Sequence, residues 1–323
     1  MAVYLLRRLL QSALVMLAMS VIVFIGIYAI GDPVEILISP EADQMERERA
    51  VRALGLDLPL WMQYLSFLGN ALRGDLGRSF VFNEPALQLI LQRMPATLEL
   101  AFGATFIALL VGLPLGLYAG LKPNSFGAKT VMAGSILGFS LPTFWVGLMM
   151  IMVFAVQLGW LPSTGRGQTV DVLGLRWSFL TWDGLQHLIM PAMNLALFKI
   201  SLVIRLTRAG VRETMLMDYV KFARAKGLSP ARVTYVHVFK NILIPVVTVV
   251  GLELGSTIAF SVVTESVFAW PGMGKLIIDS INVLDRPVIV AYLMMIVLMF
   301  ITINLLVDLA YSALDPRVRL EGK

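Results

Sequence analysis

The chain has 323 residues, of which 58% are hydrophobic, and a mean hydropathy of +0.81. Soluble proteins are usually about 45–50% apolar, so this composition excludes an ordinary soluble domain and predicts a protein of the lipid bilayer. The net charge of +5 does not indicate nucleic-acid binding, because the basic residues lie beside the ends of apolar runs. The chain has no cysteine, which excludes disulfides, thiolate metal sites and a cysteine nucleophile.

The first apolar run covers about residues 10–30 and follows Arg7-Arg8. One interpretation is a cleaved secretory signal, because Arg7-Arg8, an apolar stretch and Ala18-Met19-Ser20 imitate its three regions. The run continues through Val21 to Ile30, however, and is longer than the about 7–15 apolar residues of a signal. Its length favours an uncleaved membrane span.

A polar external segment of roughly 65 residues follows, with a helix expected near Ala42–Leu54. Five further runs are each long enough to cross a hydrocarbon core of ~30 Å, which takes ~20 helical residues. They cover about residues 98–121, 131–158, 188–206, 242–263 and 289–313. Together with the first run, they predict an all-α polytopic membrane protein with six transmembrane helices.

The segment from Arg205 to Asn241, between the fourth and fifth spans, is the most strongly charged part of the chain. Its eight basic and two acidic residues give +6, whereas the whole chain carries +5. One interpretation is an ordinary cytoplasmic loop whose charge only fixes the topology. The other is a defined structure, because the residues follow the order of two helices joined at a glycine.

Tyr219–Lys226 consists of good helix formers and precedes Gly227, the residue that most easily takes the left-handed conformation at a helix end. Ser229 then offers a side-chain cap, and Pro230 has a fixed φ suited to a first helical position. A second helix should therefore begin there and run towards Phe239. Two short helices that meet at a glycine predict a compact knob.

The fifth span has the clearest pattern within the membrane. At about 100° per residue, Gly251, Gly255 and Ala259 share one arc, and small residues allow close helix packing, so this face should meet a neighbouring helix. The opposite side is polar and contains Glu253, Ser256, Thr257, Ser261 and Thr264. Two interpretations of the polar side stay open: it faces a translocation path, or it hydrogen-bonds to adjacent helices.

Lys199 and Glu253 are charged residues placed near the middle of the bilayer. Each lies about 11 residues from one end of its span, which is ~16 Å at ~1.5 Å per residue. An unpaired charge there costs at least ~2.5–3.5 kcal/mol, so partners are expected. We predict that the two side chains approach one another or jointly line a wet cavity. Asp308 should tie the sixth span to the basic segment.

The Lys and Arg residues outside the spans indicate the orientation of the chain. Fifteen lie on the side of the two termini and the charged segment, and ten, spread over nearly twice the loop length, lie on the other side. Cytoplasmic loops carry the excess of Lys and Arg. Both termini and the charged segment are therefore expected in the cytoplasm.

The charged segment also resembles a known family. Ala223-Arg224-Ala225-Lys226-Gly227-Leu228-Ser229, followed by His237 and Lys240-Asn241, is similar to the coupling loop of ABC-importer permeases, and more narrowly to the dipeptide, oligopeptide and nickel permease group. In the broader superfamily, this loop opens with Glu-Ala-Ala and has a Leu-Pro pair shortly after the glycine. Here Lys221-Phe222-Ala223 stands at the opening, and the next proline after the knob is Pro245. This departure narrows the resemblance to the peptide-type branch.

Eight further motifs of this permease group occur in the same order and spacing, so the likeness covers almost the entire chain. They are Asp32-Pro33, Leu54-Gly55-Leu56-Asp57, Gly74-Asp75-Leu76-Gly77, Pro95-Ala96-Thr97-Leu98-Glu99, Leu141-Pro142-Thr143-Phe144-Trp145, Trp270-Pro271-Gly272-Met273-Gly274, Asn304-Leu305-Leu306-Val307-Asp308 and Asp315-Pro316-Arg317. Their proline and glycine clusters mark turns and broken helix ends.

The resemblance implies a type I importer permease fold (MetI-like), with the first span and external segment in residues 1–95 and the core permease domain in residues 96–323. In the family, the knob, here about residues 207–241, docks in a cleft of the ATP-hydrolysing subunit. Ala223, Ala225 and Gly227 would then allow close approach. The coupling residues so implied are Tyr219, Ala223, Arg224, Ala225, Lys226, Gly227, Ser229, His237, Lys240 and Asn241.

The sequence contains no recognisable catalytic or cofactor motif. The nearest approach to the phosphate-binding pattern G-x-x-x-x-G-K-[ST], Ala269 to Leu276, lacks the first glycine and the hydroxyl. His187 and His237 have no H-E-x-x-H partner, and most of the 18 methionines lie singly in apolar runs. We expect no enzymatic activity, metal or cofactor on this chain, with ATP and Mg²⁺ held by separate subunits.

The resemblance implies a permease subunit of an ATP-driven importer in the plasma membrane (the bacterial inner membrane). Lys199 and the polar side of the fifth span, which their own pattern singles out, are expected along its path. Di- and oligopeptides are the expected solutes, with glutathione, nickel complexes or oligosaccharides as alternatives. Expected partners are a second related permease, forming a heterodimer, two cytoplasmic ATP-binding subunits, an extracytoplasmic solute-binding protein and membrane lipid.

Two other classes of membrane protein are alternatives. A secondary transporter would need coupling-ion sites and commonly inverted repeats, and a membrane enzyme would need a nucleophile or a metal site. The sequence shows neither set of features.

Overall fold

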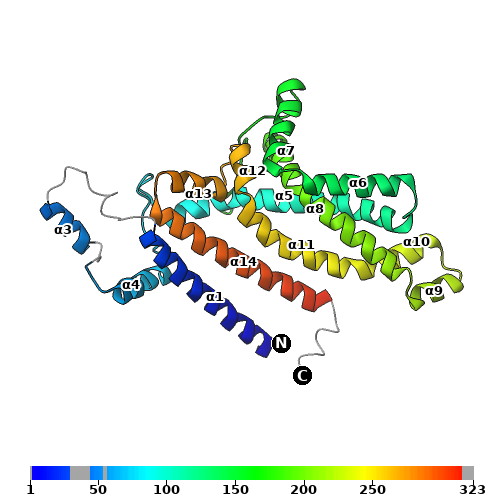
Figure 1. Cartoon of the computed structure of the whole chain (residues 1–323), viewed down its shortest axis with the longest axis horizontal. Helices are drawn as coiled ribbons and strands as arrows, with labels where there is room; N and C mark the ends of the chain where they lie inside the picture. The colour runs from blue at the N-terminus through cyan, green and yellow to red at the C-terminus, as the bar shows by residue number, and fades with distance from the viewer. Residues whose placement is uncertain (1, 30–43, 54–56, 315–323) are drawn as a thin grey trace. The chain divides into compact units, whose positions relative to one another are not determined.

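The computed structural model describes residues 2–29, 44–53 and 57–314 (Figure 1). Asp32-Pro33, Asp315-Pro316-Arg317 and most of Leu54–Asp57 lie outside the described residues. The helices are, in chain order, α1 (Ala2–Ala29), α3 (Gln44–Ala53), α4 (Leu60–Leu72), α5 (Ala86–Leu121), α6 (Phe126–Ser140), α7 (Thr143–Met150), the π-helix η1 (Ile151–Gln157), α8 (Trp182–Thr214), α9 (Asp218–Ala225), α10 (Pro230–Arg232), the π-helix η2 (Val233–Phe239), α11 (Lys240–Phe260), α12 (Val262–Val267), α13 (Met273–Asn282) and α14 (Arg286–Leu314).

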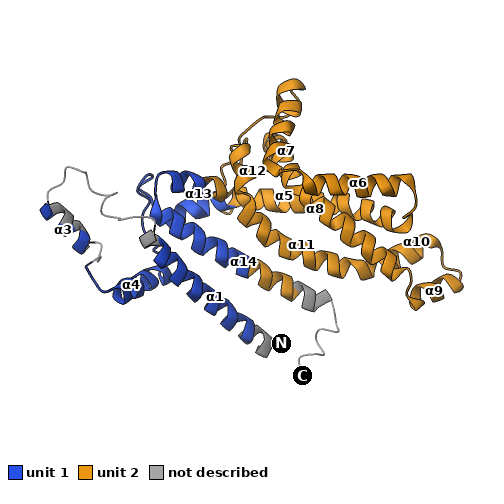
Figure 2. Cartoon of the chain, viewed as in Figure 1, with its two compact units in different colours: residues 1–94, 276–301 blue, residues 95–275, 302–323 orange. Residues whose placement is uncertain are grey.

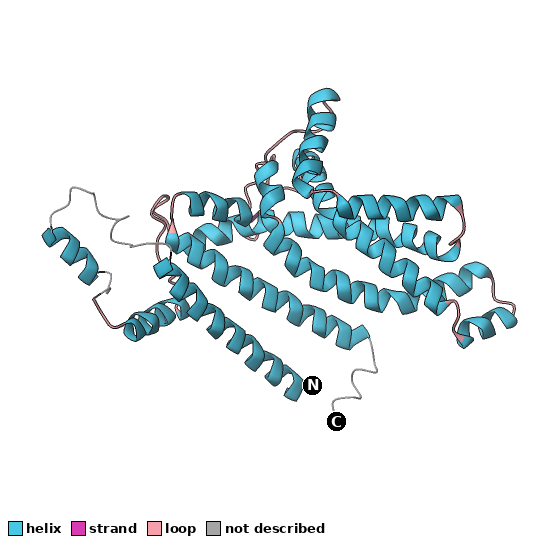
Figure 3. Ribbon diagram, viewed as in Figure 1, coloured by secondary structure: helices cyan, strands magenta, loops and turns pink. Residues whose placement is uncertain are grey.

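Nearly all of the described elements are helices (Figure 3), which confirms the predicted all-α class. The strands among them are β1 (Val170–Val172) and β2 (Leu175–Trp177), which form an antiparallel hairpin. The helix expected near Ala42–Leu54 is present as α3.

The chain divides into two compact units (Figure 2). Unit 1 comprises residues 1–94 and 276–301, and unit 2 comprises residues 95–275 and 302–323. Unit 1 thus contains a stretch from late in the sequence. The division into domains 1–95 and 96–323 stays a prediction.

In unit 1, α1 packs against α4 and the first half of α14. The hydroxyl groups of Ser20 and Tyr64 are 2.8 Å apart, and the rings of Phe24 and Tyr64 meet edge to face with centroids 5.4 Å apart. Val23 is buried together with Val290 and Met294 of α14. The first apolar run is therefore a full-length helix with defined packing partners.

In unit 2, a row of glycines brings α5 close to α8. A Cβ atom added at any of these glycines would lie only 2.6–2.7 Å from a side-chain carbon of α8. The glycines are spaced by four residues, so they lie on one side of the helix. Gly112, Gly116 and Gly120 face Val203, Thr207 and Val211, respectively.

Among the described residues, five helices are long and apolar enough to cross a membrane, and a bent helix pair brings the number to the predicted six when it is counted as one span. The continuous helix predicted over 131–158 is wrong: α6 and the α7–η1 helix meet at an angle of 104°. Pro142 has no N–H group and disfavours a helical conformation of the preceding residue, and Leu141 is extended at φ −81° and ψ 135°. The break therefore follows directly from the Leu-Pro pair.

The fifth span begins earlier than predicted. The second helix of the charged segment starts at Pro230, as expected, but it does not end near Phe239; one helix runs from Pro230 to Phe260. No glycine or proline interrupts residues 231–244, so nothing in this stretch stops the helix. The knob and the fifth span therefore share a single helix.

Candidate functional site

The knob, residues 207–241, contains the turn predicted from its sequence. Gly227 takes a left-handed conformation, φ +75°, after the end of α9. Its N–H donates to the carbonyl of Arg224 (2.9 Å), and the N–H of Leu228 donates to the carbonyl of Ala223 (3.3 Å), which is the hydrogen-bond pair of a Schellman motif. The hydroxyl of Ser229 accepts a hydrogen bond from the N–H of Arg232 (3.4 Å). The predicted helix end and cap are confirmed.

The knob has its own hydrophobic core. Val220 and Ala223 on the inner side of α9 pack against side chains from α8 and from the helix that follows Pro230. Ala223 is only 4% exposed, so its small side chain allows α9 to approach the rest of this chain. Close approach of Ala223 to a separate subunit, which the resemblance suggested, does not fit this position. The buried members of the core are Val211, Val220, Ala223, Val233, Val238 and Ile242.

The outer side of α9 carries aromatic and basic side chains. Phe222 is 61% exposed and Tyr219 is 44% exposed. The ammonium group of Lys226 lies 4.6 Å from the centre of the Phe222 ring, which is a cation–π contact. Exposed residues predicted for coupling are Tyr219, Arg224, Ala225, Lys226, Gly227, Ser229, Lys240 and Asn241.

Asn241 links the two helices of the knob. Its side-chain NH₂ group donates to the hydroxyl of Tyr219 on α9 (3.0 Å) and to the carbonyl of His237 (2.6 Å). His237 itself is half-buried. The contact spans 22 residues of sequence and positions the Tyr219 ring on the outer side of α9.

The fifth span has a small-residue side and a polar side, as predicted, but only part of the polar side is accessible. Gly251 faces α14, where an added Cβ would lie 2.6 Å from a methyl group of Val307, so the small-residue side does meet a neighbouring helix. On the polar side, Thr257, Ser261 and Thr264 are buried. Glu253 and Ser256 are half-exposed.

The buried and half-exposed members of this polar side have different partners. Thr264 accepts a hydrogen bond from the amide of Asn194 on α8 (3.0 Å), and Ser261 donates to Glu265 (2.8 Å). The hydroxyl of Ser256 donates to the Glu253 carboxylate (2.9 Å). The part from Ser261 onward therefore bonds to neighbouring residues, and the part around Glu253 remains accessible.

Lys199 is buried, 4% exposed, and its ammonium group donates to the hydroxyl of Thr105 on α5 (2.8 Å). Glu253 interacts with it electrostatically. Within the described part of the chain, the two do not form an ion pair within 4.0 Å. Each has a hydroxyl partner instead, so the direct approach of Lys199 to Glu253 stays a prediction.

Comparison with known proteins places these features in a family. Residues 112–320 match the model of the binding-protein-dependent transport system inner membrane component, and residues 1–101 match the N-terminal region described for the same component. The chain belongs to this family. It is therefore the membrane permease of an ABC importer, a transport subunit and not the ATP-hydrolysing one.

Several curated members of the inner membrane component family are similar to this chain over nearly their whole length. The di/tripeptide transport system permease protein of Pseudomonas aeruginosa is 40% identical, with 90% of each chain covered. The oligopeptide transport system permease protein of Bacillus subtilis is 38% identical, covering 98% of this chain and 99% of the relative. The glutathione transport system permease protein of Escherichia coli is 37% identical, with 98% of both covered.

The fold of the inner membrane component family is shared with a solved transporter. An inward-facing structure of the MetNI methionine ABC transporter matches with a TM-score of 0.54 at 18% identity, covering 72% of this chain and 99% of the transporter chain. The similarity supports the predicted MetI-like fold.

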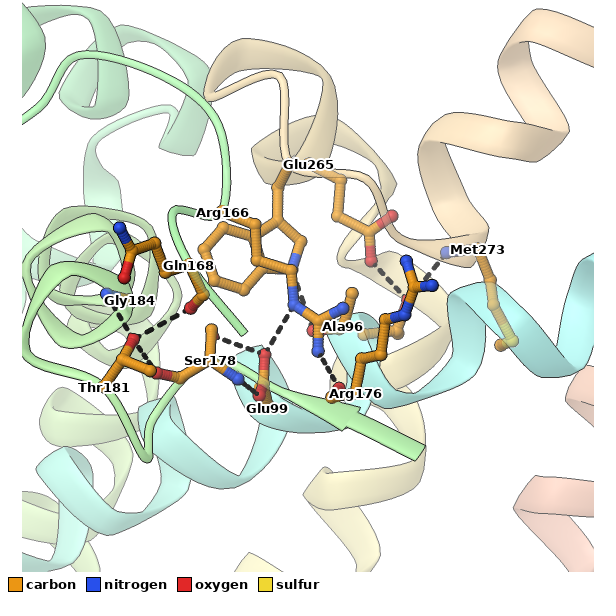
Figure 4. Close-up of polar contacts among 12 residues, drawn as sticks. Ala96, Glu99, Arg166, Gln168, Arg176, Ser178, Thr181, Gly184, Glu265 and Met273 are labelled. Carbon is orange, nitrogen blue, oxygen red and sulfur yellow. Dashed lines mark hydrogen bonds and ion pairs between the residues drawn. The ribbon is translucent and has the colours of Figure 1, made fainter. Parts of the chain in front are cut away.

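A buried polar network at the end of the fifth span was missed in the sequence (Figure 4). Glu265 is fully buried, and its carboxylate accepts hydrogen bonds from the hydroxyl of Thr97 (2.8 Å) and the backbone N–H of Lys275 (2.9 Å). The indole of Trp270 donates to the carbonyl of Ala96 (2.8 Å). Two of the family motifs, around Thr97 and Trp270, thus meet at one carboxylate.

A second missed network joins α5 to the β-hairpin region (Figure 4). Arg166 forms an ion pair with Glu99 at 2.9 Å, and both side chains are largely buried. The carboxylate of Glu99 also accepts hydrogen bonds from the N–H and hydroxyl of Ser178. The available signal in the sequence was Glu99, an isolated glutamate in the Pro95–Glu99 motif. It does not identify its basic partner, Arg166, which is 67 residues away.

Proposed function

We propose that this chain carries di- and oligopeptides inward as one half of a permease pair, powered by ATP-binding subunits. The similarity to permeases named for di/tripeptides and oligopeptides supports this solute class, because it extends over at least nine-tenths of the chain. Glutathione, a tripeptide, is the second candidate, since a glutathione-named permease is nearly as similar.

The outer side of α9 is the proposed docking surface for an ATPase. The observation that carries this proposal is the division of α9 into an inner side that fills the knob core and an outer side with Phe222 61% exposed beside basic residues. Exposed apolar patches rimmed by polar residues mark interaction sites. The assembly then contains a second permease, two ATP-binding subunits and an external solute-binding protein, with both termini in the cytoplasm.

The proposed translocation path runs along the accessible part of the fifth span. Glu253 and Ser256 form its polar surface, and Lys199 lies nearby with Thr105. Thr257, Ser261 and Thr264 support this surface from behind, because they are buried. A glutamate near a buried lysine offers complementary charges to a zwitterionic peptide.

Uptake of a labelled tripeptide into proteoliposomes tests the proposed peptide transport and the proposed ATPase docking surface. The complete assembly should accumulate peptide only when ATP and both ATPases are present; uptake that persists without the ATPases would refute ABC coupling. Phe222→Ala should lower ATP-driven uptake by about tenfold, as expected for loss of a central aromatic contact. Phe126→Ala removes a side chain that is 85% exposed outside the knob and should leave uptake unchanged.

A further inference from the structure

The break between α6 and α7 leaves backbone groups without helical partners. Pro142 is the residue before α7, and no side chain caps this end within the described residues. The N–H groups of the first turn of a helix have no acceptor inside it. Thr143 and Phe144, which open α7, are both exposed. Hydrogen-bond donors are therefore available on the open side of the break.

Asn194 of α8 presents an acceptor at the same place. Its side chain is completely buried, and its NH₂ group donates to Thr264. Its carbonyl oxygen, Oδ1, has no hydrogen-bond partner among the described residues. A buried acceptor left unpaired costs about 1–3 kcal/mol, so a ligand or water that donates to Oδ1 is favoured.

Asn194 lines a small cavity at the break. The cavity has a volume of about 20 Å³ and is also bordered by Thr143 and Val146 of α7. The stacked rings of Phe139 and Phe198, with centroids 4.7 Å apart, contribute apolar lining. A single water molecule needs about 10–15 Å³, so the cavity admits one small donor group.

We propose that this break is a binding subsite for one peptide group of the transported solute. Asn194 Oδ1 accepts a hydrogen bond from a peptide N–H, and the first-turn N–H groups of α7 donate to a peptide carbonyl. A peptide group carries one donor and one acceptor whatever its side chains are, so this subsite recognises the backbone and tolerates varied sequences. When the subsite is empty, one water occupies the position of the peptide N–H.

The geometry also explains how so small a cavity serves a larger solute. Leu141 and Thr143 at its edge are exposed, so the peptide lies across the opening and only its N–H enters. The Asn194–Thr264 hydrogen bond fixes the amide with its oxygen free, and it places the subsite beside the fifth span. The inference rests on the proposed peptide transport.

Uptake of two peptides by the complete reconstituted assembly tests the subsite. The probes are trialanine and its analogue N-methylated at both peptide nitrogens, which has lost both peptide N–H groups. The binding protein's own preference cancels when the uptake ratio of a variant is divided by that of the wild type. Asn194→Leu should lower trialanine uptake about two- to tenfold and leave the methylated analogue nearly unchanged, as expected for the loss of one hydrogen bond.

Two further variants complete the test. Thr130→Val changes an exposed threonine of α6 that does not line the cavity, and should keep the wild-type ratio. Val146→Met fills the cavity without altering Asn194, and should change the ratio as Asn194→Leu does, even where that variant fails to assemble. A wild-type ratio in an assembled Asn194→Leu or in Val146→Met would show a structural water site only and overturn the subsite. A wild-type assembly that imports neither peptide would instead overturn the proposed function.

Discussion

Gly116 of α5 lies against Thr207 of α8 so closely that a Cβ atom on the glycine would be 2.6 Å from the Cβ of the threonine. The same added atom would be 2.8 Å from the backbone oxygen of Ile204. Backbone cannot move aside as the end of a flexible side chain can, so the two helices are in contact along their main chains. Small residues at such contacts favour helix association in membranes.

Gly116→Ala should therefore separate α5 from α8. Overpacking of this kind destabilises by about 1–3 kcal/mol, so the melting temperature of the purified permease in detergent should fall. Gly69→Ala is the matched control, because a Cβ at Gly69 of α4 would have nothing within 4 Å. Equal melting temperatures for the two variants would contradict the close contact.

Gly227→Ala should strain the turn of the knob without any steric clash. The φ of +75° is unfavourable for a residue with a Cβ by about 1–2 kcal/mol, and a Cβ here would meet nothing within 4 Å. Gly227→Asn should be milder, because asparagine visits this conformation more readily. Peptide-stimulated ATP hydrolysis by the full assembly should decrease in the order wild type, Asn, Ala. A reversed order for the two variants would argue against backbone strain.

Larger side chains at Ala223 and Ala225 should affect different properties of the permease. Ala223 is in the knob core, so Ala223→Leu should overpack it and lower the thermal stability of the permease alone by about 1–3 kcal/mol. Ala225 is exposed, so Ala225→Leu should leave that stability nearly unchanged and reduce binding of the ATPase. Melting curves of the isolated permease and co-purification with the ATPases separate the two effects. Loss of stability in Ala225→Leu would contradict this assignment.

Glu265 should make the stability of the protein depend on pH. Burial raises the pKa of this carboxyl above its usual value of 4.5, although hydrogen bonds from Thr97, the N–H groups of Lys275 and Gly274, and Ser261 act in the opposite direction. The folded protein thus holds this proton more tightly than the unfolded one. The resulting stability is complete below about pH 4.5 and is lost as the pH rises through the raised pKa.

Glu265→Gln removes that titration and keeps the shape of the side chain. Melting temperatures of the variant and the wild type should therefore converge or cross as the pH changes from 4 to 8, with the wild type losing more on the alkaline side. A constant difference between Glu265→Gln and the wild type would exclude a shifted pKa.

The local features of the knob could be predicted from the sequence because they depend on neighbouring residues. A left-handed glycine, a serine cap and a proline at a first helical position act within a few residues of each other. The predicted end of the second helix, near Phe239, is wrong. The composition changes from charged to apolar residues near Asn241, and this change does not mark a structural boundary. Helices end where backbone conformation or capping ends them, and nothing there does so.

The buried polar pairs could not be predicted in the same way. Thr97 and Glu265 are 168 residues apart, and Asn194 and Thr264 are 70 residues apart. Their pairing depends on how helices pack, which the pattern of a single helix does not contain. The glycines of α5 carried a readable signal, since their spacing of four residues is typical of a close helix contact.

The unbroken helix from Pro230 to Phe260 has a mechanical consequence. From Pro230 to Glu253 it extends 23 residues, or ~35 Å at ~1.5 Å per residue. The helix contains the π-helical turn η2 (Val233–Phe239) and Pro245, which are the two kinds of position where helices bend. While these two positions keep their geometry, a tilt of ~5° about one end shifts the other by ~3 Å, roughly the length of one hydrogen bond. Movement imposed on α9 and its turn would reach the surface around Glu253 by leverage, and η2 and Pro245 would decide how much of it arrives.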